Sequence, residues 1–283
     1  MIKVLPHFTS LFAKNSSGIV HGLSKDIQEI TDLYFLKSLD SMLTSWPDKI
    51  QAHLPDVRDE ASSIDVNATH ARKLFANGMG LLFNEVHTIS PVLEKYLQLI
   101  RVNLGLPAMT IGRCLVYATP DGKGTAPHFD QNINFVLQIH GTKIWKMAPN
   151  HDVINPLTRH TMGLDPDPEM MSYLDKPLST SMPKEAQSFE LKPGSLLYVP
   201  RGYWHETSAE GDALALNFTY TAPTWIDLLT AALRGRLAQS PEWRETAFPG
   251  NPEKFQELIS ELVQDLPHWN AVDILSATDP EDV

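Results

Sequence analysis

The chain has 283 residues, a formal net charge of −11 and a single cysteine, Cys114. The length suits one large domain, or a domain with a small appendage, and the negative charge argues against a nucleic acid as the main partner. A single cysteine excludes an intrachain disulfide framework and favours a reducing cytoplasm, with Cys114 as a small core residue. No apolar run is as long as a membrane span, and the N-terminus lacks a signal-peptide stretch. We therefore expect a cytoplasmic protein without a membrane partner.

The N-terminal region, residues 1–108, is predicted to be helical, with a leading strand that packs on the core of the protein. Apolar residues recur along one side of an amphipathic helix over 26–45. Residues 50–68 are polar and are expected to be irregular. A short helix over 69–77 is expected to lead into the strand over 79–84.

A third helix of this region has clear signals at both ends. Ser90 is a strong N-cap residue, and Pro91 fits the first helical position. Gly105 is placed as the cap at the C-terminal end. We therefore expect a helix from Pro91 to Gly105.

From residue 109 to 222 the pattern changes to short strands separated by turns, which predicts a mainly β fold with a double-stranded β-helix (jelly-roll) core. Residues 128–140 and 143–148 are predicted to pair around a turn at Gly141-Thr142. A further strand is expected at the start of the core, over 110–117. Later strands are expected over 187–191, 195–200, 203–208 and 213–220.

A polar stretch over about 150–186 interrupts the predicted strands. A loop of this length is expected to be either a substrate-selecting rim over the mouth of the barrel or a plain surface excursion. Residues 223–283 are predicted to be helical again, with Thr224 as a cap and further helices opened by Pro241 and Pro252. These helices are expected to pack on the N-terminal helices or to form the face of a homodimer.

Two short motifs supply three candidate metal ligands. His128 and Asp130 are two residues apart, so on a β-strand both side chains point to the same face and can reach one point. His205 ends the segment that begins at Pro200 and can supply a third ligand from a later strand. Two histidines and one carboxylate, with open positions left over, form the facial triad of non-haem Fe(II) oxygenases.

The stretch from about Leu74 to about Phe248 resembles the JmjC group of cupin-like oxygenases, which depend on Fe(II) and 2-oxoglutarate. Four segments are similar to bacterial ribosomal-protein oxygenases: Phe75–Asn84, Ser90-Pro91, Leu137–Trp145 and Thr224–Leu229. Other positions match the factor-inhibiting asparaginyl hydroxylase more closely: Thr125, Asn134, Lys143 and Asn217–Tyr220.

The chain departs from the ribosomal oxygenases in three respects. Asn134 stands where those enzymes usually carry an apolar residue, and Ala213-Leu-Ala215 stands where they carry a Ser-x-His pattern. They also carry a winged-helix tail, for which this chain has little room. These departures argue against a ribosomal substrate, but they leave the expected chemistry intact.

The resemblance also implies which residues bind the metal and the cosubstrate. Fe(II) is expected to be bound by His128, Asp130 and His205, which leaves positions for 2-oxoglutarate and O2. The distal carboxylate of 2-oxoglutarate needs a buried cation, for which Lys143 is the candidate, and Thr125 can add a hydroxyl donor. Three further residues are expected to face the cosubstrate or the iron: Asn134, Asn217 and Tyr117.

Three hypotheses for the function remain open. The first is an Fe(II)- and 2-oxoglutarate-dependent dioxygenase that hydroxylates a protein or peptide side chain and releases succinate and CO2. The second keeps this chemistry but acts on a free amino acid or a natural-product intermediate, which the short C-terminus favours. The third is a metal-binding cupin that is not an oxygenase. Such cupins usually use a His-x-His pair with a glutamate, whereas this chain has His-x-Asp and Lys143.

Overall fold

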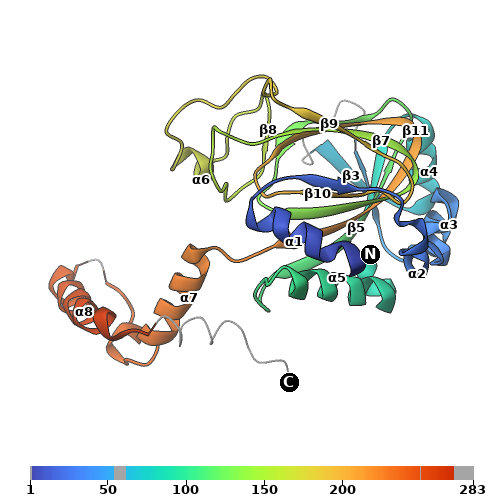
Figure 1. The fold of residues 1–283 in the computed structure, drawn as a ribbon. Coiled ribbons are helices and arrows are strands. Elements are labelled where there is room, and N and C mark those ends of the chain that lie inside the picture. The colour runs from blue at the N-terminus through green and yellow to red at the C-terminus, as the bar shows by residue number, and fades with distance from the viewer. Residues whose placement is uncertain (1, 54–61, 249, 271–283) are drawn as a thin grey trace. The chain divides into compact units, whose positions relative to one another are not determined.

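The computed structural model describes residues 2–53, 62–248 and 250–270 (Figure 1). Within these residues, eleven strands pair in antiparallel fashion, in the order β1-β10-β7-β11-β5-β4-β2-β3, with β6, β8 and β9 attached to this path. The strands are β1 (Gly18–Val20), β2 (Ile50–His53), β3 (Ser63–Val66), β4 (Gly80–Phe83), β5 (Ile111–Thr119), β6 (Gly124–Phe129), β7 (Ile133–Ala148), β8 (His160–Thr161), β9 (Gln187–Leu191), β10 (Leu196–Val199) and β11 (Trp204–Thr221).

Two long strands, β7 and β11, each have different pairing partners along their two halves. The first half of β7 pairs with β10 and with the second half of β11, which also pairs with β5. The second half of β7 pairs with β9 and with the first half of β11, which also pairs with β6. The pairing of the two strands shifts register between Glu210 and Ala215. This mainly antiparallel arrangement, with long strands shared between different partners and with flanking α-helices, confirms the predicted fold class of a double-stranded β-helix.

The predicted hairpin at Gly141-Thr142 is wrong, because both halves belong to the single strand β7. Gly141 has φ +66°, and a Cβ atom there would lie 2.2 Å from the carbonyl oxygen of Asp212 on β11. The glycine therefore permits the close approach of two bending strands rather than a reversal of the chain.

Helices precede the strands of the core. Helix α5 (Pro91–Asn103) begins as predicted, since Ser90 Oγ accepts a hydrogen bond from the Leu93 amide at 3.4 Å. Figure 1 shows α5 and α1 (Leu5–Ala13) on the same side of the sheet. Phe8 of α1 packs edge-on against Phe135 of β7, with ring centroids 5.5 Å apart. The remaining helices of this region are α2 (Gln28–Thr31), α3 (Leu39–Ser45) and α4 (Ala68–Ala76).

Two predictions for the N-terminal region are wrong. The helix predicted over 26–45 is broken, because Leu33 and Ser38 adopt extended conformations and the Ser38 side chain caps α3 separately. The stretch 50–68 is not irregular throughout, since its described ends form the paired strands β2 and β3. Pairing with the distant strand β4 stabilises β2, and a short polar pattern does not reveal such a partner.

The insert after β7 shares a small core with β6 and β11. Phe129, Val153, Met170 and Trp204 are buried together, with further apolar residues of the insert packed around them. The short helix α6 (Pro168–Met171) contributes Met170, and β8 pairs with β6. The insert is therefore packed against the strands that carry the candidate metal ligands.

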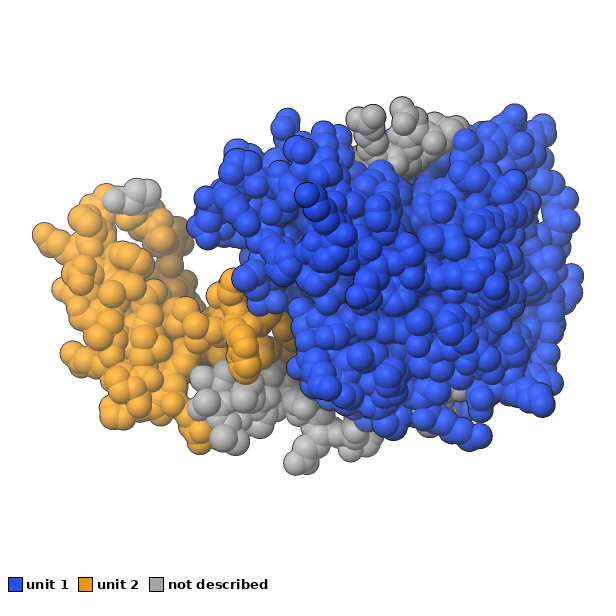
Figure 2. All heavy atoms as spheres, turned by 45° about the horizontal axis from the view of Figure 1, so that its top comes forward, with its two compact units in different colours: residues 1–105, 111–221 blue, residues 106–110, 222–283 orange. Residues whose placement is uncertain are grey.

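The chain divides into two compact units, coloured separately in Figure 2: residues 1–105 with 111–221, and residues 106–110 with 222–283. In the second unit, Thr224 and Asp227 form a capping box at the start of α7 (Trp225–Leu237), as the predicted cap requires. Helix α8 (Pro252–Asp265) is capped by Asn251, whereas Pro241 precedes only a single 3-10 turn, Glu242–Arg244. The predicted division of the chain into three regions, with boundaries after residues 108 and 222, stays a prediction. In the described residues, no helix is both long and apolar enough to cross a membrane.

Candidate active site

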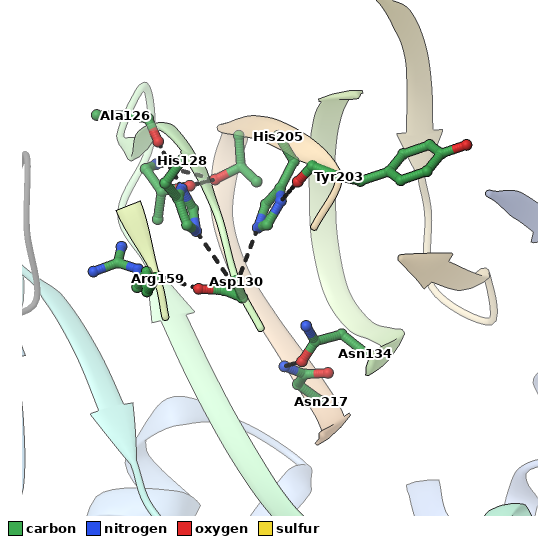
Figure 3. Close-up of polar contacts among 10 residues, drawn as sticks. Ala126, His128, Asp130, Asn134, Arg159, Tyr203, His205 and Asn217 are labelled. Carbon is green, nitrogen blue, oxygen red and sulfur yellow. Dashed lines mark hydrogen bonds and ion pairs between the residues drawn. The ribbon is translucent and has the colours of Figure 1, made fainter. Parts of the chain in front are cut away.

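The three candidate metal ligands lie together at the junction of β6 and β11 (Figure 3). His128 and His205 are paired across these two strands, and Asp130 follows the end of β6. Asp130 Oδ2 lies 3.8 Å from His128 Nε2 and 3.6 Å from His205 Nε2. One ligand atom from each of the three lies within 4.8 Å of the other two, so a single metal ion can contact all three.

Successive side chains of a strand point to opposite faces, and this alternation directs the three ligands into the cavity. Phe129, between His128 and Asp130, points to the opposite face and packs edge-on against Trp204, which precedes His205. Both aromatic residues are fully buried in the core of the insert. Burial of Phe129 and Trp204 on one face therefore fixes the ligands on the other face.

Backbone carbonyl groups orient both imidazole rings. His128 Nδ1 lies 2.7 Å from the carbonyl oxygen of Ala126, and His205 Nδ1 lies 2.9 Å from that of Tyr203. A carbonyl oxygen only accepts, so Nδ1 carries the hydrogen in each ring and the Nε2 lone pair faces Asp130. Burial lowers the pKa of His205, and burial together with the neighbouring His205 lowers the pKa of His128 to about 3. Both rings are therefore neutral at pH 7, as metal ligands must be.

Asp130 is ionised, and one of its two carboxylate oxygens pairs with the cation of Arg159. Burial alone would raise its pKa, but His128, His205 and Arg159 outweigh burial and lower it. Arg159 Nε forms an ion pair with Asp130 Oδ1 at 3.2 Å, which leaves Oδ2 facing the histidines. Arg159 belongs to the insert, directly before β8, and no sequence pattern marked it as part of the site.

Lys143 is a buried cation on the inner face of β7. Its side chain is 4% exposed, and Nζ donates a hydrogen bond to Thr119 Oγ1 at 3.1 Å. Nζ also lies 5.8 Å from the ring centroids of both Tyr117 and Trp145. Burial lowers the pKa of Lys143 to about 8. Among the described residues no acidic side chain forms an ion pair with it, so its charge is available to an anionic ligand.

The other predicted cosubstrate residues lie around the same space. Asn217 Nδ2 donates to Asn134 Oδ1 at 3.0 Å, and no described group bonds the buried Asn217 Oδ1. Thr125 Oγ1 lies 3.0 Å from Thr207 Oγ1 of β11, a hydroxyl partner that sequence reasoning did not find. All eight predicted site residues line one cavity of about 550 Å³, which has the size of a small-molecule site.

The donor set fits a non-haem Fe(II) centre with a dicarboxylate cosubstrate. Two neutral imidazoles and one carboxylate are the ligands of a facial triad, which leaves coordination positions open. A buried lysine in the same cavity fits the distal carboxylate of 2-oxoglutarate.

Comparisons with known proteins relate the core of this chain to a known family. A family model described as the JmjC domain matches residues 106–228. The uncharacterized protein YxbC of Bacillus subtilis (strain 168) is 32% identical over 219 residues, which cover 75% of this chain and 66% of that protein. Ribosomal oxygenase 1 of Rattus norvegicus is 27% identical over 197 residues, which cover 67% of this chain and 30% of the relative.

A solved structure shares the fold. The X-ray structure of E. coli ycfD has a TM-score of 0.52 at 17% sequence identity, and the match covers 92% of this chain and 66% of that chain. The similarity to the rat protein spans less than a third of that protein's length. Residues 106–228 of the chain match the JmjC domain family.

Proposed function

We propose that this protein is an Fe(II)- and 2-oxoglutarate-dependent dioxygenase that hydroxylates a protein or peptide side chain. The observation that carries this proposal is one cavity with a neutral His–His pair, an ionised Asp130 and a buried lysine that has no acidic partner among the described residues. The sequence relationship to a protein named ribosomal oxygenase supports a polypeptide substrate. The net charge of −11 supports a protein without a nucleic-acid partner, and the single cysteine supports a reducing cytoplasm.

Each residue has a defined part in this proposal. His128, Asp130 and His205 hold Fe(II), and Lys143 binds the distal carboxylate of 2-oxoglutarate, with Thr125 and Tyr117 beside it. When bound, the metal and 2-oxoglutarate supply the oxidation of an unactivated C–H bond by O2, with release of succinate and CO2. The Asn134–Asn217 pair presents an amide oxygen to the cavity without another described partner and is placed to orient a bound group.

We also propose that the second unit can form a homodimer face. Helices α7 and α8 carry large apolar side chains that are more than half exposed in this chain: Trp225, Ile226, Leu229, Phe255 and Val263. Exposed apolar groups of this size are typical of interaction surfaces.

The substrate class is tested by mass spectrometry of cellular polypeptides after co-expression. We expect a polypeptide that gains one oxygen atom with the wild-type protein and not with Asp130→Ala. A gain of oxygen confined to free amino acids or other small molecules would contradict a polypeptide substrate and favour the second hypothesis.

Affinity for 2-oxoglutarate is expected to depend on pH through Lys143. Only the protonated lysine attracts the distal carboxylate, and burial lowers the pKa of this group to about 8. Below pH 7 the dissociation constant of 2-oxoglutarate is expected to be constant. Between pH 7 and pH 9 it is expected to rise about tenfold, because one proton is linked to binding. The measurement is a titration of the anaerobic Fe(II)-loaded protein, with Lys143→Arg as the variant that keeps its charge. A dissociation constant unchanged from pH 7 to pH 9 would contradict the assignment.

Arg159→Ala is expected to weaken metal binding by about 10- to 100-fold, the usual effect of removing a group that orients a ligand. The physical reason is the ion pair with Asp130 Oδ1, which leaves only Oδ2 directed at the histidines. Equilibrium titration with Fe(II) or Co(II) measures the change. Arg201→Ala is the matched control, because the Arg201 guanidinium bonds the insert at the Pro156 carbonyl oxygen. Equal losses in both variants would assign the effect to loosening of the insert instead.

A further inference from the structure

One wall of the cavity is formed by the same face of three neighbouring strands, β5, β4 and β2. Tyr117 of β5 lies opposite Leu82 of β4, and Leu82 lies opposite Gln51 of β2, so these three side chains point to one side. Because neighbouring strands lie about 5 Å apart, β2 runs about 10 Å from the strand that carries Tyr117. The wall therefore extends beyond the proposed cosubstrate residues, to a strand that a substrate can contact.

Two polar side chains of β2 face the cavity, Gln51 and His53. Ile50 and Ala52, which alternate with them, are fully buried on the opposite face. Residues two apart on a strand are about 7 Å apart, and an extended polypeptide presents its peptide groups to one side at the same interval. Both edges of β2 are already paired, with β3 and β4, so a chain of matching repeat would lie over this face and contact its side chains.

Two buried polar atoms in the cavity are left to bond a ligand. His53 Nε2 and Gln131 Oε1 have no hydrogen-bond partner among the described residues, and Gln131 directly follows the metal ligand Asp130. Burial, and secondly the charge of Arg159, lower the pKa of His53, so its ring is neutral at pH 7. A neutral ring nitrogen can donate and an amide oxygen can accept. Because buried polar atoms without partners are costly, the two atoms fit a bound molecule that offers one acceptor and one donor.

A second donor–acceptor pair lies on the same wall. Asn84 Nδ2 donates to Gln51 Oε1 at 3.1 Å, and both side chains line the cavity. This bond leaves the amino group of Gln51 able to donate and the side-chain oxygen of Asn84 able to accept. A peptide group has one acceptor and one donor, so it can bond both side chains at once. The wall therefore offers peptide groups two matching pairs of hydrogen-bonding atoms.

We propose that these four uncharged side chains bind the main chain of an extended polypeptide segment of the substrate. His53 donates to a carbonyl oxygen and Gln131 accepts from an N–H group beside the triad. Gln51 and Asn84 bond a peptide group about two residues away. This inference rests on the proposed function, since it assigns the space beside the triad to a polypeptide. Main-chain groups are common to all sequences, so this part of the site accepts many sequences, whereas a free amino acid spans only one of the two pairs.

The test compares probes that differ only in their main chain. Anaerobic protein loaded with Fe(II) and 2-oxoglutarate is mixed with random-sequence peptides, with the same peptides N-methylated at every second residue, or with the corresponding free amino acids. Retention during ultrafiltration, quantified by mass spectrometry, measures binding. We expect the unmodified peptides to bind at least about tenfold more tightly than either other probe, because N-methylation removes main-chain donors. Equal retention of the probes, retention of the free amino acids alone, or retention of none would overturn the proposal.

Variants of the wall assign the effect to the named side chains. His53→Phe and Gln131→Met retain an apolar side chain of similar size and remove the hydrogen-bonding atoms, and Gln51→Met does the same for the second pair. Each variant is expected to weaken binding of the unmodified peptides about three- to tenfold, as loss of one hydrogen bond does. Gln98→Met is the matched control, because Gln98 is exposed on α5 and does not line the cavity. Equal weakening in the control, or undiminished binding by all three variants of the wall, would contradict the subsite.

Admission of air to the same samples separates this inference from the function beneath it. Succinate formation together with preferential binding of the unmodified peptides supports both proposals. Succinate formation without that preference would overturn the main-chain subsite alone. Preferential binding of the unmodified peptides with no succinate from any sample would overturn the proposed oxygenase function and leave a peptide-binding cavity.

Discussion

Replacement of Asp130 by alanine is expected to abolish succinate formation and to weaken metal binding by more than about 100-fold, beyond the loss seen when a merely supporting group is removed. Asp130 supplies the only carboxylate of the triad, and its Oδ2 atom lies within 4 Å of Nε2 of both histidines. Without it, His128 and His205 remain as two neutral ligands beside the positive charge of Arg159, which repels a cation. Equilibrium titration with Fe(II) and an assay of succinate measure the two effects.

The control for this variant is Asp40→Ala. Asp40 forms an ion pair with Arg72, but its side chain is 75% exposed, so its removal is expected to change stability by less than about 1 kcal/mol. Metal binding and succinate formation should be unchanged in this variant. Full turnover by Asp130→Ala would rule out the triad.

Lys143→Met is expected to abolish 2-oxoglutarate binding and to stabilise the folded protein. Methionine has a similar volume and no charge, so it fits the buried site between Tyr117 and Trp145. Burial lowers the pKa of Lys143 from 10.5 to about 8, which corresponds to a cost of about 3 kcal/mol for the buried charge at pH 7. The Thr119 hydroxyl loses its donor, which costs about 1 kcal/mol. The expected net gain is about 2 kcal/mol in the free energy of unfolding.

The sign of this effect changes with pH in a defined way. A lysine whose folded-state pKa is lowered destabilises the fold fully below about pH 8, and the cost fades as pH rises toward 10.5. Urea unfolding at pH 7 and pH 10 should therefore show a larger gain at pH 7. Lys146→Met is the control on the same strand, because Lys146 is 44% exposed and pairs with Glu206. A Lys143→Met variant that still forms succinate, or that is less stable at pH 7, would contradict the assignment.

The alternation of side chains on strands explains how much of the site the sequence could predict. His128 and Asp130 share a face because they are two residues apart, and the structure places them with His205 as that spacing requires. The cap at Ser90 and the capping box at Thr224 depend only on residues a few positions away, so both helix starts were predictable.

Features that depend on distant partners were not predictable in this way. The local sequence at Gly141 predicts a turn, but β11 pairs with both halves of β7, and no local pattern indicates this long pairing. Strand β2 is stabilised by pairing with β4, which lies beyond an intervening helix. Arg159 reaches Asp130 because β8 pairs with β6, and a two-residue strand inside a polar insert has no periodic signal.

The central claim is that the cavity binds Fe(II) and 2-oxoglutarate together and turns the cosubstrate over. The most direct measurement is succinate formed from 2-oxoglutarate by protein reconstituted anaerobically with Fe(II) and then exposed to air, for the wild type and for His128→Ala. The predicted result is slow accumulation of succinate by the wild type and none by the variant. Metal-loaded wild-type protein that neither forms succinate nor binds 2-oxoglutarate would contradict the account and favour a cupin that is not an oxygenase.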